Sequence, residues 1–369
     1  MNSEDKIEKL NWVSKLLIVI SIAFVISSFA LPFILTHFSI IDFTNTGEIG
    51  DTIGGIMNPF ISIASTAMMF LAFYMQYNAN KLQRQLFNEQ IQNEKEQFKE
   101  EIAEQKKQFE RNQFENQFFE MLKTHKENVN EIFVETIYYT YDGNIERNLK
   151  HTQTLSGRRA LDYIIEEINI AYYINKAMNK NSFTPQQCLN EAYYFVWNGI
   201  ENQKQGSLLA TKTLLDYLII FRKNSISGMP NNKYGGVPEI SYSPHKKDFI
   251  PFNNHSSSLG HYYRHLFQTV KYVVSKDFLT YEEKRNYLRI LRAQMSNPEQ
   301  VLLFYNWLAG YGDKWECETN HFLTDYRMIH NVWQEMIIGD FDIEEIITKE
   351  NPNYLKENNR RNDYLFEFQ

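Results

Sequence analysis

Two long runs near the start of the chain contain no Asp, Glu, Lys or Arg. The first covers residues 16–41, and the second covers residues 52–80, with its most apolar part at 56–77. A helix needs about 20 apolar residues, at a rise of 1.5 Å each, to cross a hydrocarbon core of about 30 Å. We therefore expect transmembrane helices at 16–36 and 56–77, joined as a hairpin by a short extracytoplasmic loop at 37–55.

The charges around the two runs predict the orientation of this hairpin. Residues 37–51, which lie between the two expected helices, contain no lysine or arginine. Basic residues flank the pair of helices on both sides: Lys6, Lys9 and Lys15 before the first, Lys81 and Arg84 after the second. Cytoplasmic flanks of membrane helices carry the excess of Lys and Arg. We therefore expect both chain termini in the cytoplasm, with residues 1–15 as a cytoplasmic N-terminus.

An eleven-residue repeat follows the second apolar run. Residues 87–97 and 98–108 share one pattern of apolar and charged positions, and a third unit begins at residue 109. Eleven residues make three helical turns, so the apolar positions stay on one face of a nearly straight helix. These positions form what we call the apolar stripe: Phe87, Ile91, Phe98, Ile102 and Phe109.

A thin apolar stripe on an otherwise polar helix needs a partner to cover it. We therefore expect residues 78–115 to form a coiled-coil-like helix that continues from the second span. The partner is either another subunit, which would make the protein a homo-oligomer, or a helix of the same chain.

The remainder of the chain has the period of amphipathic helices. Apolar residues recur at spacings of three and four, and capping boxes mark helix starts at Thr184–Gln187, Thr280–Glu283 and Asn297–Gln300. No alternating strand pattern is evident, so an all-α cytoplasmic helical domain is expected at 116–340. Within it, residues 224–258 are rich in Gly, Pro, Asn and Ser and predict a long loop, and residues 341–369 predict a polar C-terminal tail.

Composition narrows the possible functions. The 369 residues carry a formal net charge of −7, which argues against a generic nucleic-acid binder. The two cysteines, Cys188 and Cys317, exclude a disulfide framework and cannot build a zinc knuckle on their own. No cofactor is expected.

The most suggestive cluster of reactive side chains follows the long loop: His261, Arg264 and His265. Two histidines at i and i+4 lie on one helical face, the spacing that metal-binding imidazoles need. However, Tyr262 stands where the zincin pattern requires Glu, and only His255 is a nearby further ligand, so we predict no metal site.

Two interpretations of this cluster remain open. His261, Arg264 and His265 are weak candidates for acid–base catalysis. Alternatively, together with Tyr262 they form a buried polar network with the long loop and neighbouring carboxylates. Two other closely spaced Arg–His pairs are further candidates for a ribonuclease-type site: Arg327 with His330, and Arg147 with His151.

Four stretches together resemble the AbiC-like family of phage abortive infection proteins: GDTIGGIMNPFIS (50–62), FFEMLKTHKENVNEI (118–132), GHYYRHLFQTVKYV (260–273) and YLRILRAQMSNPEQVLLFYNWL (287–308). The similarity spans about residues 47–332. It implies a bacterial antiphage role, in which an infected cell stops supporting phage growth. Together with the two predicted spans, a bacterial role leads us to expect the protein in the inner membrane, with both termini in the cytoplasm. The resemblance assigns no catalytic residue.

Two functions are compatible with these features. In the first, the protein is a membrane-anchored sensor–effector without catalysis, whose partners are the lipid bilayer, further copies of the chain and a phage-encoded trigger protein. In the second, the helical domain is a membrane-tethered RNase-like enzyme that acts on RNA through the region of His261, Arg264 and His265. Two apolar spans and the acidic composition favour the first.

Overall fold

The computed structural model describes residues 3–37, 46–142, 147–179, 182–201, 209–231, 236–351 and 365–366. The chain divides into two compact units, Met1–Glu110 and Arg111–Gln369. The division falls close to the predicted start of the helical domain at residue 116.

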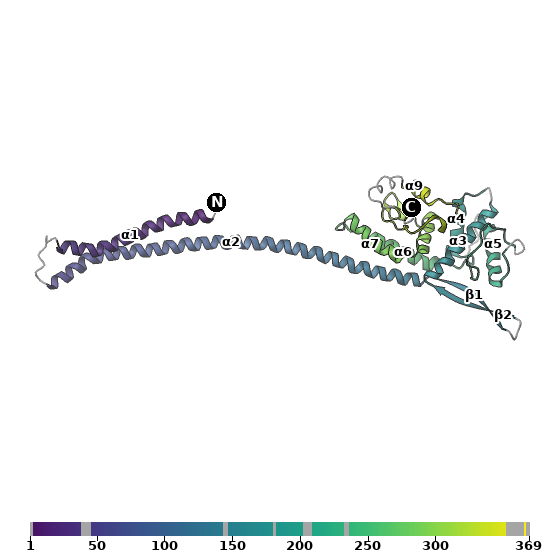
Figure 1. Cartoon of the computed structure of the whole chain (residues 1–369), viewed down its shortest axis with the longest axis horizontal. Coiled ribbons are helices and arrows are strands. Elements are labelled where there is room, and N and C mark those ends of the chain that lie inside the picture. The colour runs from purple at the N-terminus through teal and green to yellow at the C-terminus, as the bar shows by residue number, and fades with distance from the viewer. Residues whose placement is uncertain are drawn as a thin grey trace. The chain divides into compact units, whose positions relative to one another are not determined.

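Unit 1 is built from two helices, α1 (Ser3–His37) and the first part of α2 (Thr46–Asn130) (Figure 1). Ser21 and Ser28 of α1 are buried, and so are Ala64 and Leu71 of α2. Each pair is seven residues apart, the spacing that keeps side chains on one face of a helix. The small side chains of Ser21, Ser28 and Ala64 allow two helices to approach closely. Of the loop predicted at 37–55, residues 38–45 lie outside the described residues, whereas residues 46–55 are helical and form the start of α2, so the second helix begins earlier than predicted.

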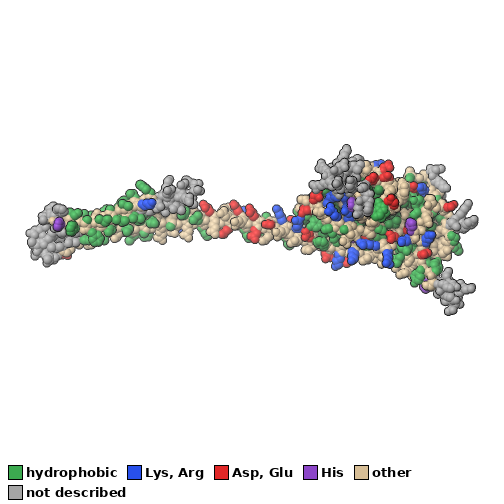
Figure 2. Space-filling view, in the orientation of Figure 1, with side chains coloured by type: hydrophobic (Ala, Val, Ile, Leu, Met, Phe, Trp, Pro, Cys, Tyr) green, Lys and Arg blue, Asp and Glu red, His purple; other side chains and the backbone are tan. Residues whose placement is uncertain are grey.

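Most apolar side chains of unit 1 are exposed. Figure 2 shows hydrophobic side chains over the visible face of α1 and the adjoining part of α2. One helix segment, within Met57–Asn130, is long and apolar enough to cross a membrane, and only 11% of its most apolar window is buried. The shorter apolar stretch of α1 is Ile18–Leu31. Exposed rings such as Phe29, Phe70 and Phe73 form an apolar surface of the kind that marks a membrane or protein contact.

The helix α2 is unbroken from Thr46 to Asn130. It therefore contains the second apolar run, the repeat and the first residues of the helical domain in one element, as the sequence predicted. Glu, Lys and Gln are strong helix formers, which explains why so long a solvated segment stays helical. Along the repeat, Phe87, Phe98 and Phe109 remain more than 60% exposed in the single chain.

The exposed apolar stripe leads to a prediction about assembly. Changing Phe98 and Phe109 to glutamate should lower the oligomeric state of the detergent-solubilised protein, because charges would replace the side chains that a partner helix covers. The mass measured by light scattering checks this, with Gln97→Glu and Gln108→Glu as a matched control off the stripe. An unchanged mass would mean that the stripe does not hold subunits together.

Unit 2 is a mostly helical domain around one hydrophobic core. After the end of α2, its helices and strands follow in this order: β1 (Phe133–Asp142), β2 (Arg147–Ser156), α3 (Arg158–Met178), α4 (Pro185–Asn198), α5 (Leu209–Ser227), α6 (Ser256–Val274), α7 (Tyr281–Gln294), α8 (Asn297–Leu308), β3 (Glu316–Cys317), β4 (Asn320–His321) and α9 (Ile343–Glu350). The core takes fully buried side chains from α2, α3, α6 and α8, among them Phe118, Ile168, Leu266 and Leu302.

The predicted predominance of helix is confirmed, and the hairpin of β1 and β2 is an addition that the sequence pattern did not reveal. Its strands pair antiparallel, from Phe133 opposite Ser156 to Asp142 opposite Arg147. In β1, the neighbouring residues Thr136 and Ile137 are both buried, so apolar and polar positions do not alternate. The pattern of a half-buried strand is therefore missing.

The predicted helix starts agree closely with the structure. Thr184 and Thr280 are the N-caps of α4 and α7, each in a complete capping box. The third box lies one residue earlier than predicted, because Ser296 and not Asn297 is the N-cap of α8 and Glu299 is its third helical residue.

The long loop and the C-terminal segment are more closely packed than their composition suggests. Helix α5 continues to Ser227, and the described part of the loop after residue 236 packs against β1, where Ile137 N donates to Asp248 O at 2.9 Å. The segment expected as a polar tail contains α9, whose Ile343 and Ile347 are buried. Of the residues after 351, only 365 and 366 lie among the described residues, and both are buried.

Candidate functional site

The three predicted site residues lie on α6 but are not joined to one another. His261 and Arg264 are exposed, and His265 is half-buried. Arg264 Nε donates to the carbonyl oxygen of Gly260 at 2.9 Å, within its own helix. No hydrogen bond or ion pair between described residues connects the three side chains. Burial and the nearby His125 lower the pKa of His265, which favours its neutral form.

A buried polar network does form at α6, but it is centred on Glu299 of α8. The side chain of Glu299 is fully buried. Its Oε2 accepts a hydrogen bond from Tyr262 OH at 3.2 Å and lies 3.2 Å from His125 Nε2. Its Oε1 accepts from Arg158 Nε at 3.3 Å and from Ser296 N at 3.0 Å. The network therefore includes Tyr262. It does not include His261 or Arg264, which the sequence had suggested as further members.

The surroundings of Glu299 keep its carboxylate ionised. Burial alone would raise the pKa of Glu299, but the neighbouring His125 and hydrogen bonds from the backbone and side chain of Ser296 outweigh it, so the pKa is lowered. A buried carboxylate that already accepts hydrogen bonds from Tyr262, Arg158 and Ser296 is a poor general base. The chemistry of this network is to hold α2, α3, α6 and α8 together.

A second buried carboxylate anchors the long loop to the start of α6. His255 Nε2 lies 3.1 Å from Glu167 Oε1, and Phe252 N donates to Glu167 Oε2 at 2.8 Å. Phe252 has a φ of 63°, a conformation that side-chain-bearing residues adopt at some cost. His255 is therefore a packing residue that fixes the loop, and not a third ligand beside His261 and His265.

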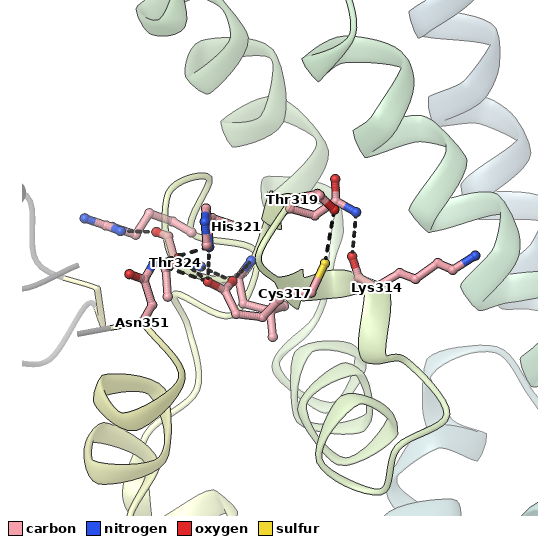
Figure 3. A network of polar contacts seen from close by, with 10 residues as sticks. Lys314, Cys317, Thr319, His321, Thr324 and Asn351 are labelled. Carbon is pink, nitrogen blue, oxygen red and sulfur yellow. Dashed lines mark hydrogen bonds and ion pairs between the residues drawn. The ribbon is translucent and has the colours of Figure 1, made fainter. Parts of the chain in front are cut away.

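A third network surrounds Glu316 (Figure 3). Its carboxylate accepts hydrogen bonds from Thr324 Oγ1 at 2.6 Å and from the backbone N–H groups of Leu323 and Thr324 at 3.0 and 3.1 Å. His321 Nδ1 lies 3.0 Å from Oε1. Asn351, just after α9, donates to Thr324 Oγ1 at 3.0 Å. Burial raises the pKa of Glu316. This network fastens the C-terminal segment to the segment after α8.

The described members of the other Arg–His pairs contact the backbone or the β1–β2 hairpin. Arg327 is fully buried and donates to the carbonyl oxygen of Thr324, while His330 Nδ1 lies 2.7 Å from Leu365 O. His151 Nε2 lies 2.7 Å from Thr140 Oγ1 in the hairpin. The side chain of Arg147, the arginine paired with His151, lies outside the described part of the structure. Within the residues that the structure describes, no three His, Cys, Asp or Glu side chains are placed to hold a metal ion.

The sequence did not single out Glu167, Glu299 or Glu316 as central residues. Glu299 was visible only as part of a capping box, in which the acidic residue is normally exposed. The signal that marks α6 correctly is its period, because Tyr262, Leu266 and Val270 recur every four residues and are all buried. His261 and Arg264 lie off this face.

The comparison with known families agrees with the resemblance. Residues 254–337 match the family model described as "Putative phage abortive infection protein". No curated protein and no solved structure matches the chain. The matched stretch runs from the start of α6 through α8 and contains both Glu299 and Glu316. Residues 254–337 are therefore similar to the phage abortive infection family that the sequence resembles, and this similarity supports a role in antiphage defence.

Proposed function

We propose that the protein is a membrane-anchored antiphage defence protein, in which the cytoplasmic helical domain senses infection and the apolar helices of unit 1 act on the membrane. The abortive infection family supports the defence role. The exposed apolar surfaces of α1 and of the first part of α2 support the anchor, since such helices are stable in a hydrocarbon core. The bacterial inner membrane is the location that this role implies.

One observation supports a connection between sensing in the helical domain and action on the membrane. The helix that contains the candidate membrane span also supplies core residues of the helical domain, since Phe114, Phe118 and His125 of α2 are buried within unit 2. A helix is a stiff element, so a shift of this buried end changes the position or tilt of the same helix elsewhere. A trigger bound to unit 2 could thus alter the membrane segment without any catalytic step.

This proposal is preferred to the membrane-tethered nuclease because of the geometry at α6. His261 and Arg264 are exposed and point to no shared partner, and the carboxylates nearby are engaged in packing networks. A phage-encoded protein is the proposed trigger, and a homo-oligomer joined through the apolar stripe is the proposed assembly.

Membrane topology tests the anchor. Reporter fusions should place Asn45 outside the cytoplasm and both Asp5 and Asn353 inside, because Lys and Arg flank the hairpin and are missing from its loop. In the same strain, expression of the full chain should lower the efficiency of plating of a sensitive phage. A cytoplasmic signal at Asn45 would contradict the hairpin, whatever the effect on phage.

A further inference from the structure

A cavity of about 630 Å³ lies within unit 2, where four elements end or begin. Its walls come from the end of α2, the end of β2, the start of α3 and the end of α7. The polar residues that matter for its chemistry are His125, Lys126, Thr154, Ser156, Arg158 and Arg159. The volume lies within the range of pockets that hold small ligands, about 300–1,000 Å³.

The charge of this cavity is opposite to that of the chain. Lys126, Arg158 and Arg159 line it, and no Asp or Glu is among its lining residues, although the whole chain carries a net charge of −7. Glu299, which lies behind the wall, pairs with Arg158 and His125. The side chains of Lys126 and Arg159 are exposed, so their positive charges can neutralise an anion in the cavity.

The start of α3 adds further donors. Its N-cap is Gly157, which offers no side-chain cap, and its first turn contains no acidic residue. The first N–H groups of a helix lack partners within the helix and carry partial positive charge. Gly157 has a φ of 70°, and a Cβ there would come within 3.2 Å of Asn130 Oδ1, so the wall is closely fitted at this point.

His125 is an independent sign of a polar binding site. Its side chain is 2% exposed and lines the cavity. Its Nε2 lies 3.2 Å from Glu299 Oε2, an ion-pair distance, and neither ring nitrogen has a hydrogen-bond partner among the described residues. A buried polar nitrogen without a partner destabilises the fold, and a bound polar group would satisfy it.

We propose that this cavity binds the phosphate groups of a small polyphosphorylated metabolite, such as a nucleoside triphosphate. Lys126, Arg159 and the first N–H groups of α3 would contact phosphate oxygens, and Thr154 and Ser156 would add hydroxyl donors. The site lies beside the Glu299 network, and Arg158 belongs to both. That the bound metabolite is a signal that sets the state of the helical domain rests on the proposed defence function.

Calorimetric titration of the full chain in detergent tests the site, with inorganic triphosphate and ATP as probes. Arg159→Ala and Lys126→Ala should each weaken binding roughly tenfold or more, because each removes one charge-assisted contact. Arg159→Lys should bind close to the original affinity. Arg289→Ala, an exposed arginine of α7 that does not line the cavity, is the control and should leave binding unchanged.

Two results would overturn the site: no measurable binding of either probe, or equal losses in Arg159→Ala and Arg289→Ala. Phage plating separates the site from the defence function. Binding that is lost in Arg159→Ala together with protection supports the signalling role, and binding lost with protection intact rejects that role but keeps the site. A chain that binds triphosphate but never protects would contradict the defence function alone.

Discussion

Replacing Glu299 with alanine should lower the melting temperature of the helical domain on the order of 10 °C and abolish protection against phage. The change strands His125, Tyr262 and Arg158, which lie on three different helices and all direct polar atoms at this carboxylate. Removing one partner from a buried ionic network typically costs about 3–5 kcal/mol. Thermal unfolding followed by circular dichroism measures the effect.

A matched control is available in the same domain. Glu283 has the same capping role in α7 that Glu299 has in α8, but it is not buried, and its partners are Thr280 and Arg111. Glu283→Ala should therefore cost only about 1 kcal/mol, the usual value of a cap. Equal losses of melting temperature in the two variants would show that capping, and not the buried network, accounts for the role of Glu299.

His261→Ala separates this packing role from catalysis. His261 is exposed, and no hydrogen bond or ion pair joins it to another described residue. The variant should therefore keep its unfolding free energy within about 0.5 kcal/mol and keep protection. Unchanged melting behaviour with lost protection would instead favour the enzyme alternative.

Local signals account for the parts of the fold that were predicted from sequence. Helix starts at Thr184 and Thr280 depend on residues three apart, and the continuity of α2 depends on the absence of strong breakers along the repeat. The hairpin was missed because Thr136 and Ile137 are both buried, partly through contacts with the loop near Asp248 that is remote in sequence. Such tertiary contacts override the period of a short strand.

The buried networks could not be predicted because their members are far apart along the chain. Glu299 meets His125, and Glu167 meets His255, across separations that no motif spans. One departure from local rules was visible, however. Arg158 and Arg159 begin a helix, a place where acidic residues are favoured. Such local conflicts often mark functional positions, and here the pair lines the cationic cavity.

A proline in the repeat should uncouple the two units without unfolding either. Gln97 is exposed, lies off the apolar stripe and belongs to the solvated part of α2. Gln97→Pro removes one backbone hydrogen bond and forces a kink, at about 3 kcal/mol or more for the helix. The core of unit 2 begins at Phe114, beyond this point, so the domain should melt as before and the chain should remain in the membrane fraction.

If the stiffness of α2 carries the signal, phage protection should be lost in Gln97→Pro and retained in Gln97→Ala. Light scattering must accompany the plating assay, because a kink could also disturb the apolar stripe, and the interpretation requires an unchanged oligomeric mass. Retained protection in the proline variant would show that the membrane segment does not respond through a continuous helix. The sensor and the anchor would then act as separate parts, and the link proposed through Phe114 and Phe118 would be wrong.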